Sequence, residues 1–241
     1  SSKNPRDLYE AALSSWEFAQ HLPPKQKLKV HVINPDWNHD RTVIQLSTKY
    51  MPFLIDSITA ELNNLGLRIY QLIHPVFKIT RNKQGKVTAI ESSKNGQRES
   101  LESVMQLEVT FTNRKDACQR ITEAVEYVLR GVHLAVSDWK NMLARGKDTL
   151  EDLSGLPKTV SKSHASEVQD FFIWLLDNHF TFLGVCDYDI KTTEKGQKLV
   201  AVEKSALGIF RLEDAYSGRK GVDVLTHTIR PGTDTELIDF S

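Results

Sequence analysis

The sequence has no excess of positive or negative charge. Lysine and arginine together number 31, as do aspartate and glutamate, in a chain of 241 residues. Proteins that bind nucleic acids or anionic membranes normally carry a basic excess. We therefore expect neither a nucleic acid nor a membrane as a partner, although a local basic patch is compatible with this balance.

Long apolar runs and cysteines are also scarce. No run approaches the roughly 20 apolar residues that span a bilayer, and no charged-then-apolar leader opens the chain. Cys118 and Cys186 lie far apart in the sequence, which suits a reducing compartment. A reactive thiol needs a nearby histidine or a helix N-terminus, and neither is evident, so both thiols are predicted to fill the core. These features predict a cytoplasmic protein.

The short motifs that mark common enzyme sites are missing as well. There is no G-x-G-x-x-G, Walker loop, H-E-x-x-H, C-x-x-C or G-x-S-x-G. No catalytic, cofactor-binding or metal-binding residue is therefore predicted. The run from Asn34 to Asp40 has oxygen-bearing side chains at every second position, like a calcium loop. Its sixth position is His39 instead of glycine and its twelfth is Gln45 instead of glutamate, so a plain turn is the better interpretation.

An amphipathic helix lies at the centre of the stretch from Lys49 to Pro75. Pro52 is predicted at its first position, where the missing N–H costs nothing. Asp56 falls in the first turn, where the helix dipole stabilises a negative charge. Gly66 is predicted to end the helix with positive φ. The apolar stripe of this helix consists of Met51, Ile55, Ile58, Leu62 and Leu65.

Strands are predicted on both sides of this helix. Residues 67–73 are apolar on both faces, which favours the middle of a sheet. Residues 67–80 and 86–91 are predicted to form a hairpin. The strand from Met105 to Phe111 alternates cleanly with Gln106 and Glu108, which predicts one dry face and one wet face.

The order of these elements predicts an α+β fold. Without the first strand and the short return of the hairpin, the first unit reads βαββα. Its natural closure is a ferredoxin-like β-α-β-β-α-β fold, an antiparallel sheet with helices on one face. The last strand of that fold is missing after the second helix, and the early strand at 28–33 could fill that edge.

The chain is predicted to contain three regions. Residues 1–26 form an N-terminal helix. Residues 27–157 form the α+β domain, with a long helix at its C-terminal end. Residues 158–241 form a second, smaller α+β unit that is incomplete at its C-terminal end, with weak strand patterns at 222–225 and 236–240. The two outer regions each begin with an apolar helix face, formed by Leu8, Ala12, Trp16 and Ala19 in the first and by Val168, Phe171, Phe172, Leu175 and Leu176 in the last.

Two separated motifs carry a family resemblance. The first is MPFLIDS at Met51–Ser57, followed by Glu61-Leu62-Asn63, Gly66 and Ile73-His74-Pro75-Val76. The second is HFTFLG at His179–Gly184, followed by Tyr188-Asp189 and Leu207-Gly208. In this order they resemble the N-terminal region of the very large bacterial NAD-dependent glutamate dehydrogenases. The resemblance covers about residues 27–212.

The resemblance implies more than the residues alone do. It implies ACT-type ferredoxin-like modules here and a dehydrogenase domain much further along the parent chain. That parent would oxidise glutamate to 2-oxoglutarate and ammonia with NAD, in amino-acid catabolism. It would be a homo-oligomer under allosteric control, and this region would contact its own downstream catalytic domain and other subunits. We expect no cofactor in this fragment and no activity from it.

The resemblance also indicates one candidate loop. ACT domains often bind amino acids between the first strand and the first helix, where the sequence commonly reads D-x-P-G. Here that segment is Tyr50-Met51-Pro52-Phe53, with Phe53 where glycine would let a ligand approach the backbone. A small amino-acid effector and a protein–protein contact through sheet edges both stay open. The candidate effector or interface residues are Ser47, Tyr50, Met51, Pro52, Phe53 and Leu54.

Two other functions are compatible with the sequence. One is a free-standing enzyme or ligand-binding module with an unrecognised site. The other is an RNA-binding ferredoxin-like domain, which requires exposed aromatic residues on the central strands and a basic face. Gln106 and Glu108 on the expected wet face argue against RNA.

Overall fold

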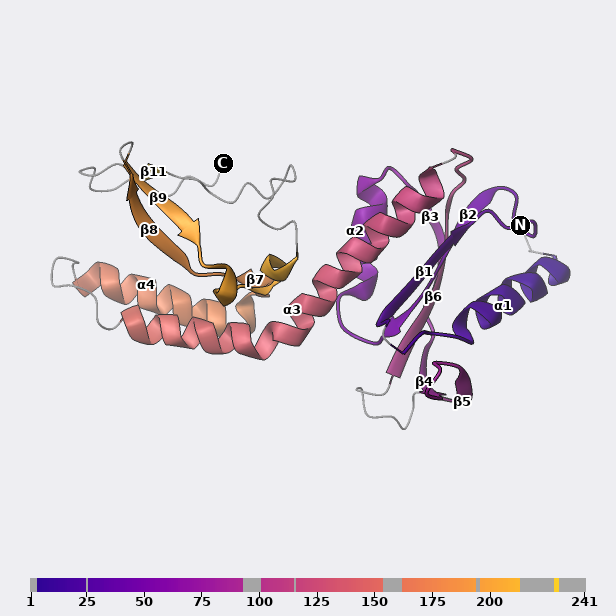
Figure 1. Ribbon diagram of the computed structural model, residues 1–241, viewed down its shortest axis with the longest axis horizontal. Helices are drawn as coiled ribbons and strands as arrows, with labels where there is room; N and C mark the ends of the chain where they lie inside the picture. Colours follow the sequence, from indigo (N-terminus) through magenta and orange to yellow (C-terminus); the bar gives the residue numbers. More distant parts are fainter. Residues whose placement is uncertain are drawn as a thin grey trace. The chain divides into compact units, whose positions relative to one another are not determined.

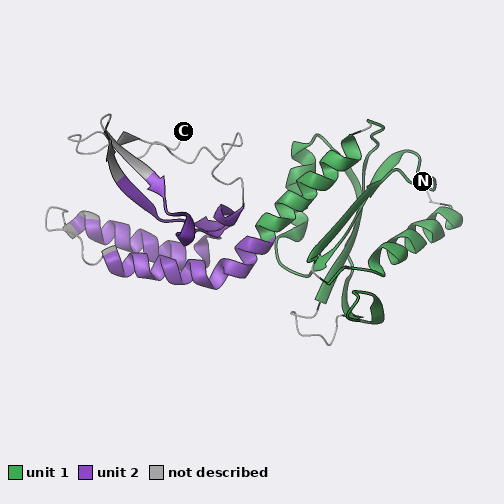
Figure 2. Ribbon diagram, viewed as in Figure 1, with its two compact units in different colours: residues 1–132 green, residues 133–241 purple. Residues whose placement is uncertain are grey.

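The computed structural model describes residues 4–24, 26–92, 101–114, 116–153, 162–193, 196–212 and 228–229. The chain divides into two compact units, Ser1–Val132 and His133–Ser241 (Figure 2). The change from one unit to the other falls within a single helix. The boundary expected at 157/158 from the sequence lies outside the described residues and stays a prediction.

An antiparallel sheet forms the centre of unit 1, which confirms the α+β class. Its order is β1-β2-β6-β4-β5, with β3 also paired to β6. The early strand β1 occupies the edge beside β2, as the sequence predicted. The strands are β1 Leu28–Ile33, β2 Arg41–Lys49, β3 Ile69–Ile73, β4 Val76–Arg81, β5 Val87–Ser92 and β6 Leu101–Thr110.

Helices cover both faces of this sheet. α2 (Leu54–Asn64) and the first half of α3 (Ala117–Leu153) lie on one face, and α1 (Pro5–Ala19) lies on the other (Figure 1). The two helices predicted for the ferredoxin-like domain therefore share one face, and α1, predicted as a separate N-terminal helix, covers the other. Ser14 and Ser15 of α1 hydrogen-bond to side chains of the central strands, so this helix is part of the sandwich.

The main core lies between the sheet and the α2/α3 side. Opposite residues of antiparallel strands point to the same face, and Ile44 pairs with Leu107 while Leu46 pairs with Met105. All of these apolar side chains are at most 1% exposed. Burial of such side chains is the main stabilising contribution to a domain of this kind. The helices add Ile58, Leu62, Ile121 and Val125 to this layer.

The central helix α2 begins later than predicted. Pro52 lies in a turn, and the helix starts at Leu54 after Phe53, which takes a left-handed conformation. Leu54 consequently faces the core (2% exposed), whereas Ile55, which was predicted there, is 39% exposed. Asp56 does lie in the first turn. Gly66 ends the helix with φ +73°, as predicted.

The strand after α2 is an edge strand, so the prediction of a central strand is wrong. Within the described residues β3 pairs only with β6, and Tyr70 and Ile73 are exposed. The continuous strand expected over 67–80 is interrupted at His74-Pro75, because proline has no N–H to donate. The hairpin itself is confirmed by the pairing of β4 with β5.

The described part of unit 2 contains helices and short sheets. The second half of α3 is accompanied by α4 (Lys162–Trp174), which continues as a π-helical turn at Leu175–His179. β7 (Gly184–Val185) pairs with β10 (Leu207–Gly208), and β9 (Gly196–Ala201) pairs with both β8 (Tyr188–Thr193) and β11 (Thr228–Ile229). Two 3-10 turns lie at Glu203–Ser205 and Ile209–Arg211.

Three details of unit 2 bear on the predictions. Phe171 is 57% exposed, so its predicted place on the core face of α4 is wrong. The strand patterns at 222–225 and 236–240 lie outside the described residues. Across the described parts of both units, no helix is long and apolar enough to cross a membrane.

Candidate functional site

The six candidate residues differ in burial. Ser47 is 1% exposed on β2, on the face that α1 covers. Met51 and Leu54 are also buried, at 8% and 2% exposed. Pro52 and Phe53 face outward. The loop therefore has two buried anchors and an exposed tip, which suits a contact surface better than a ligand pocket.

Phe53 has the backbone conformation that glycine would supply. Its φ of 67° and ψ of 4° lie in the left-handed region, which costs a side chain with Cβ about 1–2 kcal/mol. Its carbonyl accepts the N–H of Ser57 at 3.0 Å, which starts α2. Its ring is 48% exposed. Phe53 therefore adopts the left-handed turn despite its strain. It exposes an aromatic ring at the position where ACT domains commonly have glycine.

The beginning of α2 is a poor site for a ligand carboxylate. A helix N-terminus attracts anions through its free N–H groups and its dipole, and the side chain of Phe53 makes no capping hydrogen bond there. Asp56, however, already places a negative charge in the first turn. A second carboxylate would be repelled by it.

Tyr50 and His74 connect this loop to the broken β3–β4 strand. The Tyr50 N–H donates to the Leu101 carbonyl at 2.8 Å. The centroids of the Tyr50 and His74 rings are 6.4 Å apart. His74 Nε2 lies 2.9 Å from Ser103 Oγ. Burial lowers the pKa of His74, which favours the neutral ring. Ser103 is fully buried, so this pair holds strands together and is not an accessible nucleophile with its base.

The wet face predicted for β6 is in fact covered. Gln106 and Glu108 are only 6% and 5% exposed because α1 lies over them. Gln106 Oε1 accepts the hydroxyl of Ser15, and Gln45 Nε2 donates to Ser14 Oγ at 3.0 Å. The face that an RNA-binding domain of this type would use is thus occupied by α1.

Positively charged side chains hydrogen-bond to backbone carbonyls at and just after the C-terminal end of α1. Lys29 Nζ donates to the carbonyls of Phe18 (2.7 Å) and His21 (3.1 Å), and Arg81 Nη2 donates to that of Ala19 (3.1 Å). Positive charge at a helix C-terminus is favourable. Arg81 also makes two hydrogen bonds to Glu102, at 2.7 and 2.8 Å. Burial, and to a lesser extent Arg81, lowers the pKa of Lys29.

The Asn34–Asp40 run is a turn, as interpreted from the sequence. Asn34 Oδ1 accepts the hydroxyl of Thr42 at 2.7 Å, and Asn34 Nδ2 donates to the Thr112 carbonyl at 2.8 Å. Among the described residues no three His, Cys, Asp or Glu side chains form a group that could hold a metal ion.

The two parts of the second motif meet in unit 2. Gly184 pairs with Gly208, and the Ile209 N–H donates to the Leu183 carbonyl at 2.9 Å. Gly208 has φ +62°, and a Cβ there would lie 2.1 Å from the Leu183 oxygen. A Cβ on Gly184 would lie 2.7 Å from the Phe210 ring. Both glycines are therefore needed for this close approach.

No sequence motif indicated the residue that anchors this turn. Asp138 of α3, 6% exposed, accepts the Gly208 N–H at 2.9 Å and Arg211 Nη1 at 2.9 and 3.0 Å. Burial works to raise the pKa of Asp138, but Gly208, Arg211 and His133 together hold it below its ordinary value. The available signal was a lone acid on the buried stripe formed by Ala135, Asp138 and Met142.

A second ion pair joins α3 to the segment before β8. Arg145 donates to Asp187 Oδ1 from Nη2 at 2.9 Å and from Nε at 3.2 Å. The Asp187 N–H donates to Ser205 Oγ at 2.7 Å. Cys186 in this unit and Cys118 in unit 1 are both half-buried. These contacts hold unit 2 together and bring no reactive group to an open surface.

Comparison with known proteins identifies the family. Residues 1–125 match the family described as "Glutamate dehydrogenase, ACT1 domain". The chain belongs to this family. The recognition made from the two motifs is thereby confirmed.

Two curated relatives extend the comparison to both units. The chain is 34% identical over 214 residues to the NAD-specific glutamate dehydrogenase of Halomonas elongata, a match that covers 86% of this chain. It is 30% identical over 241 residues to the protein of the same name from Pseudomonas aeruginosa, with 98% of this chain covered. The matches span only 13% and 15% of these relatives.

Proposed function

We propose that this chain is the N-terminal regulatory and assembly region of a large NAD-dependent glutamate dehydrogenase. The parent protein would oxidise glutamate to 2-oxoglutarate and ammonia with NAD bound further along its chain. The described residues would carry no catalytic step. The observation that carries this proposal is the ACT1 match over residues 1–125, in a chain that spans about one-seventh of relatives named NAD-specific glutamate dehydrogenases.

We propose further that unit 1 is a ferredoxin-like ACT-type module completed from its N-terminal side. The order β1-β2-β6 with β3 on the far side of β6 supports this interpretation. β1 would stand where the last strand of a ferredoxin-like fold pairs with the first. α1 would then be an addition that closes the second face of the sheet.

Assembly is favoured over a small amino-acid effector at the Ser47–Leu54 loop. Met51 and Leu54 fill the core, and Asp56 already supplies a negative charge at the start of α2. Pro52 and Phe53 instead offer an exposed apolar tip next to Ile55. A contact with another subunit or with the downstream catalytic domain would cover that tip.

The test of the proposed function compares the full-length protein with residues 1–241 alone. NADH formation from glutamate and NAD is followed for both at equal molar concentration. The full-length protein should turn over glutamate, and residues 1–241 should give no rate above the blank. Turnover by residues 1–241 would show a free-standing enzyme instead, and no turnover by the full-length protein would contradict the assigned reaction.

Calorimetry of the chain against the common amino acids tests the effector alternative. Phe53→Gly is measured beside the unchanged chain, because glycine suits the left-handed conformation and removes the ring. We expect no heat from either protein. Heat from Phe53→Gly alone would show a pocket that Phe53 closes, and heat from both would overturn the preference for assembly.

A further inference from the structure

A stack of exposed rings lies on the outer side of α4. The rings of Phe171 and Trp174 are nearly parallel with centroids 6.0 Å apart, and the Trp174 and His179 rings stack at 4.8 Å. Phe171 is 57% exposed and Trp174 is 46% exposed. A single exposed apolar residue is ordinary, but three stacked rings form a continuous surface. We call Phe171, Trp174 and His179 the α4 ring surface.

The backbone after α4 places His179 on this stack. The π-helical turn at Leu175–His179 contains Asn178 with φ +58°. This irregular turn brings the imidazole back toward the preceding helix, where His179 Nδ1–H donates to the Trp174 carbonyl at 3.0 Å. Asn178 in the left-handed conformation ends the helix here, as asparagine sometimes does at helix C-termini. The third ring of the stack therefore depends on a specific deviation from regular helix.

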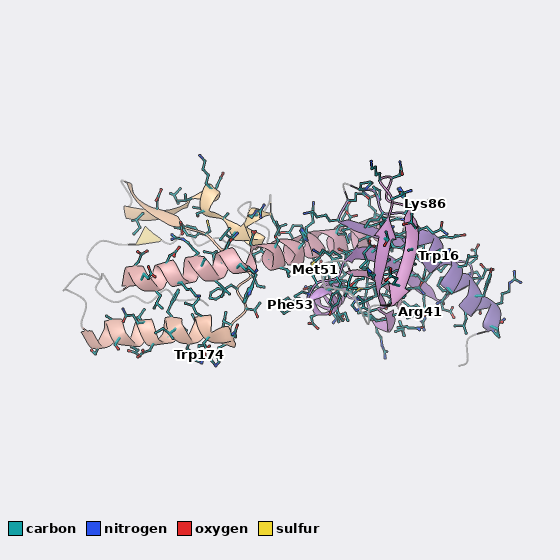
Figure 3. The ribbon with its side chains drawn as sticks, turned by 90° about the horizontal axis from the view of Figure 1, so that it is seen from below. Trp16, Arg41, Met51, Phe53, Lys86 and Trp174 are labelled. Carbon is teal, nitrogen blue, oxygen red and sulfur yellow. The ribbon has the colours of Figure 1, made fainter. Side chains whose placement is uncertain are left out.

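The packing of unit 2 does not depend on the exposed α4 ring surface. The opposite side of α4 packs against α3, where a Cβ on Gly146 would lie 2.7 Å from Leu176. Phe172 and Leu176 are more buried than Phe171 and Trp174. Trp174 points to the side of α4 away from α3 (Figure 3). The ring surface is thus additional to the packing that holds the helix in place.

Three carboxylates lie close to the ring surface in sequence. Residues 163–179 include Glu167, Asp170 and Asp177 but no lysine or arginine, and the one lysine of α4, Lys162, is its first residue, nine positions before Phe171. All three carboxylates are exposed. Glu167 precedes Phe171 by four residues and Asp170 precedes Trp174 by four, and residues at this spacing are neighbours on a helix surface. Each helical ring thus has an acidic neighbour.

We propose that the α4 ring surface binds an arginine-bearing segment of a protein partner. A guanidinium stacks on aromatic faces and at the same time pairs with carboxylates. The described surface offers both groups side by side. An anionic lipid surface and a nucleic acid would be repelled by the three carboxylates, and so would the same face of a second copy.

The proposal is tested by fluorescence anisotropy with labelled synthetic helices and the full-length protein. One helix carries leucines on one side and arginines on the other, and matched versions replace every arginine by lysine or by glutamate. The arginine helix should bind, the lysine helix should bind several-fold more weakly, and the glutamate helix should not bind. Trp174→Ser should weaken binding of the arginine helix by roughly tenfold, since buried aromatic contacts dominate such interfaces.

Two further variants separate the cation site from general stickiness. Glu167→Gln combined with Asp170→Asn should weaken binding and flatten its salt dependence, because fewer charges are then screened. Ile173→Ser is the matched control, since Ile173 is 52% exposed on the same helix and neighbours Trp174 in sequence. It lies outside the stack and should leave binding unchanged.

Several results would overturn the proposal. These are no binding of the arginine helix, equal binding of the glutamate helix, no effect of Trp174→Ser, or an equal effect of Ile173→Ser. Binding of phosphatidylglycerol vesicles that is lost in Trp174→Ser would indicate a lipid surface instead. Concentration-dependent self-association that is lost in Trp174→Ser would indicate a second copy instead.

Discussion

The two faces of the unit 1 sheet are covered by helices in different ways. Toward α2 and α3, Leu46, Leu62 and Leu107 are fully buried in a layer of apolar side chains. Toward α1, Gln45 and Gln106 hydrogen-bond to serines of the helix. The apolar face stabilises by area, whereas net contributions of hydrogen bonds are small and depend on every partner being present. The first face therefore contributes most of the buried apolar area, whereas the α1 face combines a smaller apolar cluster of Ala19, Ile79 and Val104 with hydrogen bonds that specify where α1 lies.

The largest expected effect is on the apolar face. Leu62→Ala should lower the free energy of unfolding by about 3 kcal/mol, because it removes buried methyl groups and leaves a cavity. The control is Ile55→Ala on the exposed side of the same helix, with an expected change below about 1 kcal/mol. Urea denaturation of unit 1 measures both, and equal losses would contradict the assignment of the buried face.

Two variants on the α1 face should differ from each other. Gln106→Ala should cost about 1–2 kcal/mol, because the Ser15 hydroxyl loses its partner under α1. Among the described residues, buried Ser47 Oγ has no hydrogen-bond partner. Ser47→Ala should therefore change stability by less than about 0.5 kcal/mol or increase it. A large loss in Ser47→Ala would reveal a missing partner at this position.

The two left-handed residues at the ends of α2 give opposite expectations. Gly66→Ala should destabilise unit 1 by roughly 1 kcal/mol, because a Cβ is strained at φ +73°. Phe53→Gly should be neutral or stabilising by about 0.5 kcal/mol, since relief of strain is offset by a more flexible unfolded chain. Chemical denaturation midpoints test both, and a higher midpoint for Gly66→Ala would contradict the first.

The smallest expected effect concerns pH. His74 is paired with Ser103 beside the apolar layer, and burial lowers its pKa below the ordinary 6.5. The folded state then binds fewer protons than the unfolded state. The stability that neutral His74 contributes is therefore fully present above pH 6.5 and is lost as the pH falls below it. Unfolding free energies at several pH values should show this decline, and His74→Gln should make it shallower. An identical pH profile in both proteins would show that His74 does not cause the decline.

The elements that follow from local rules were predictable from the sequence. Gly66 ends α2 because left-handed backbone requires glycine or a strained substitute, and the β4–β5 hairpin follows from alternation around Gly85. The sequence also offered β1 as a strand that could fill the open edge, and β1 lies at an edge of the sheet. The start of α2 was misplaced because Phe53 adopts a conformation unusual for phenylalanine, which shifts the buried position from Ile55 to Leu54.

Features that depend on tertiary contacts were not predictable in this way. Alternation in β6 identifies a polar face but cannot tell that a helix with serines will cover it. Apolar residues on both faces of β3 suggested a central strand. At the sheet edge, however, the Tyr70 ring makes a cation–π contact with Arg41, whose guanidinium lies 3.8 Å from the ring centroid. Asp138 is one acid in a long helix, and its partners Gly208 and Arg211 are about 70 residues away in sequence.

The central claim is that the exposed tip of the Ser47–Leu54 loop acts through assembly of the parent enzyme. Sedimentation velocity of the full-length protein with Phe53→Asn tests it most directly, because asparagine tolerates left-handed backbone and removes the ring. Ile90→Thr, on exposed β5, is the control. The account predicts smaller assemblies for Phe53→Asn and unchanged ones for Ile90→Thr. Assemblies of unchanged size in Phe53→Asn would contradict it.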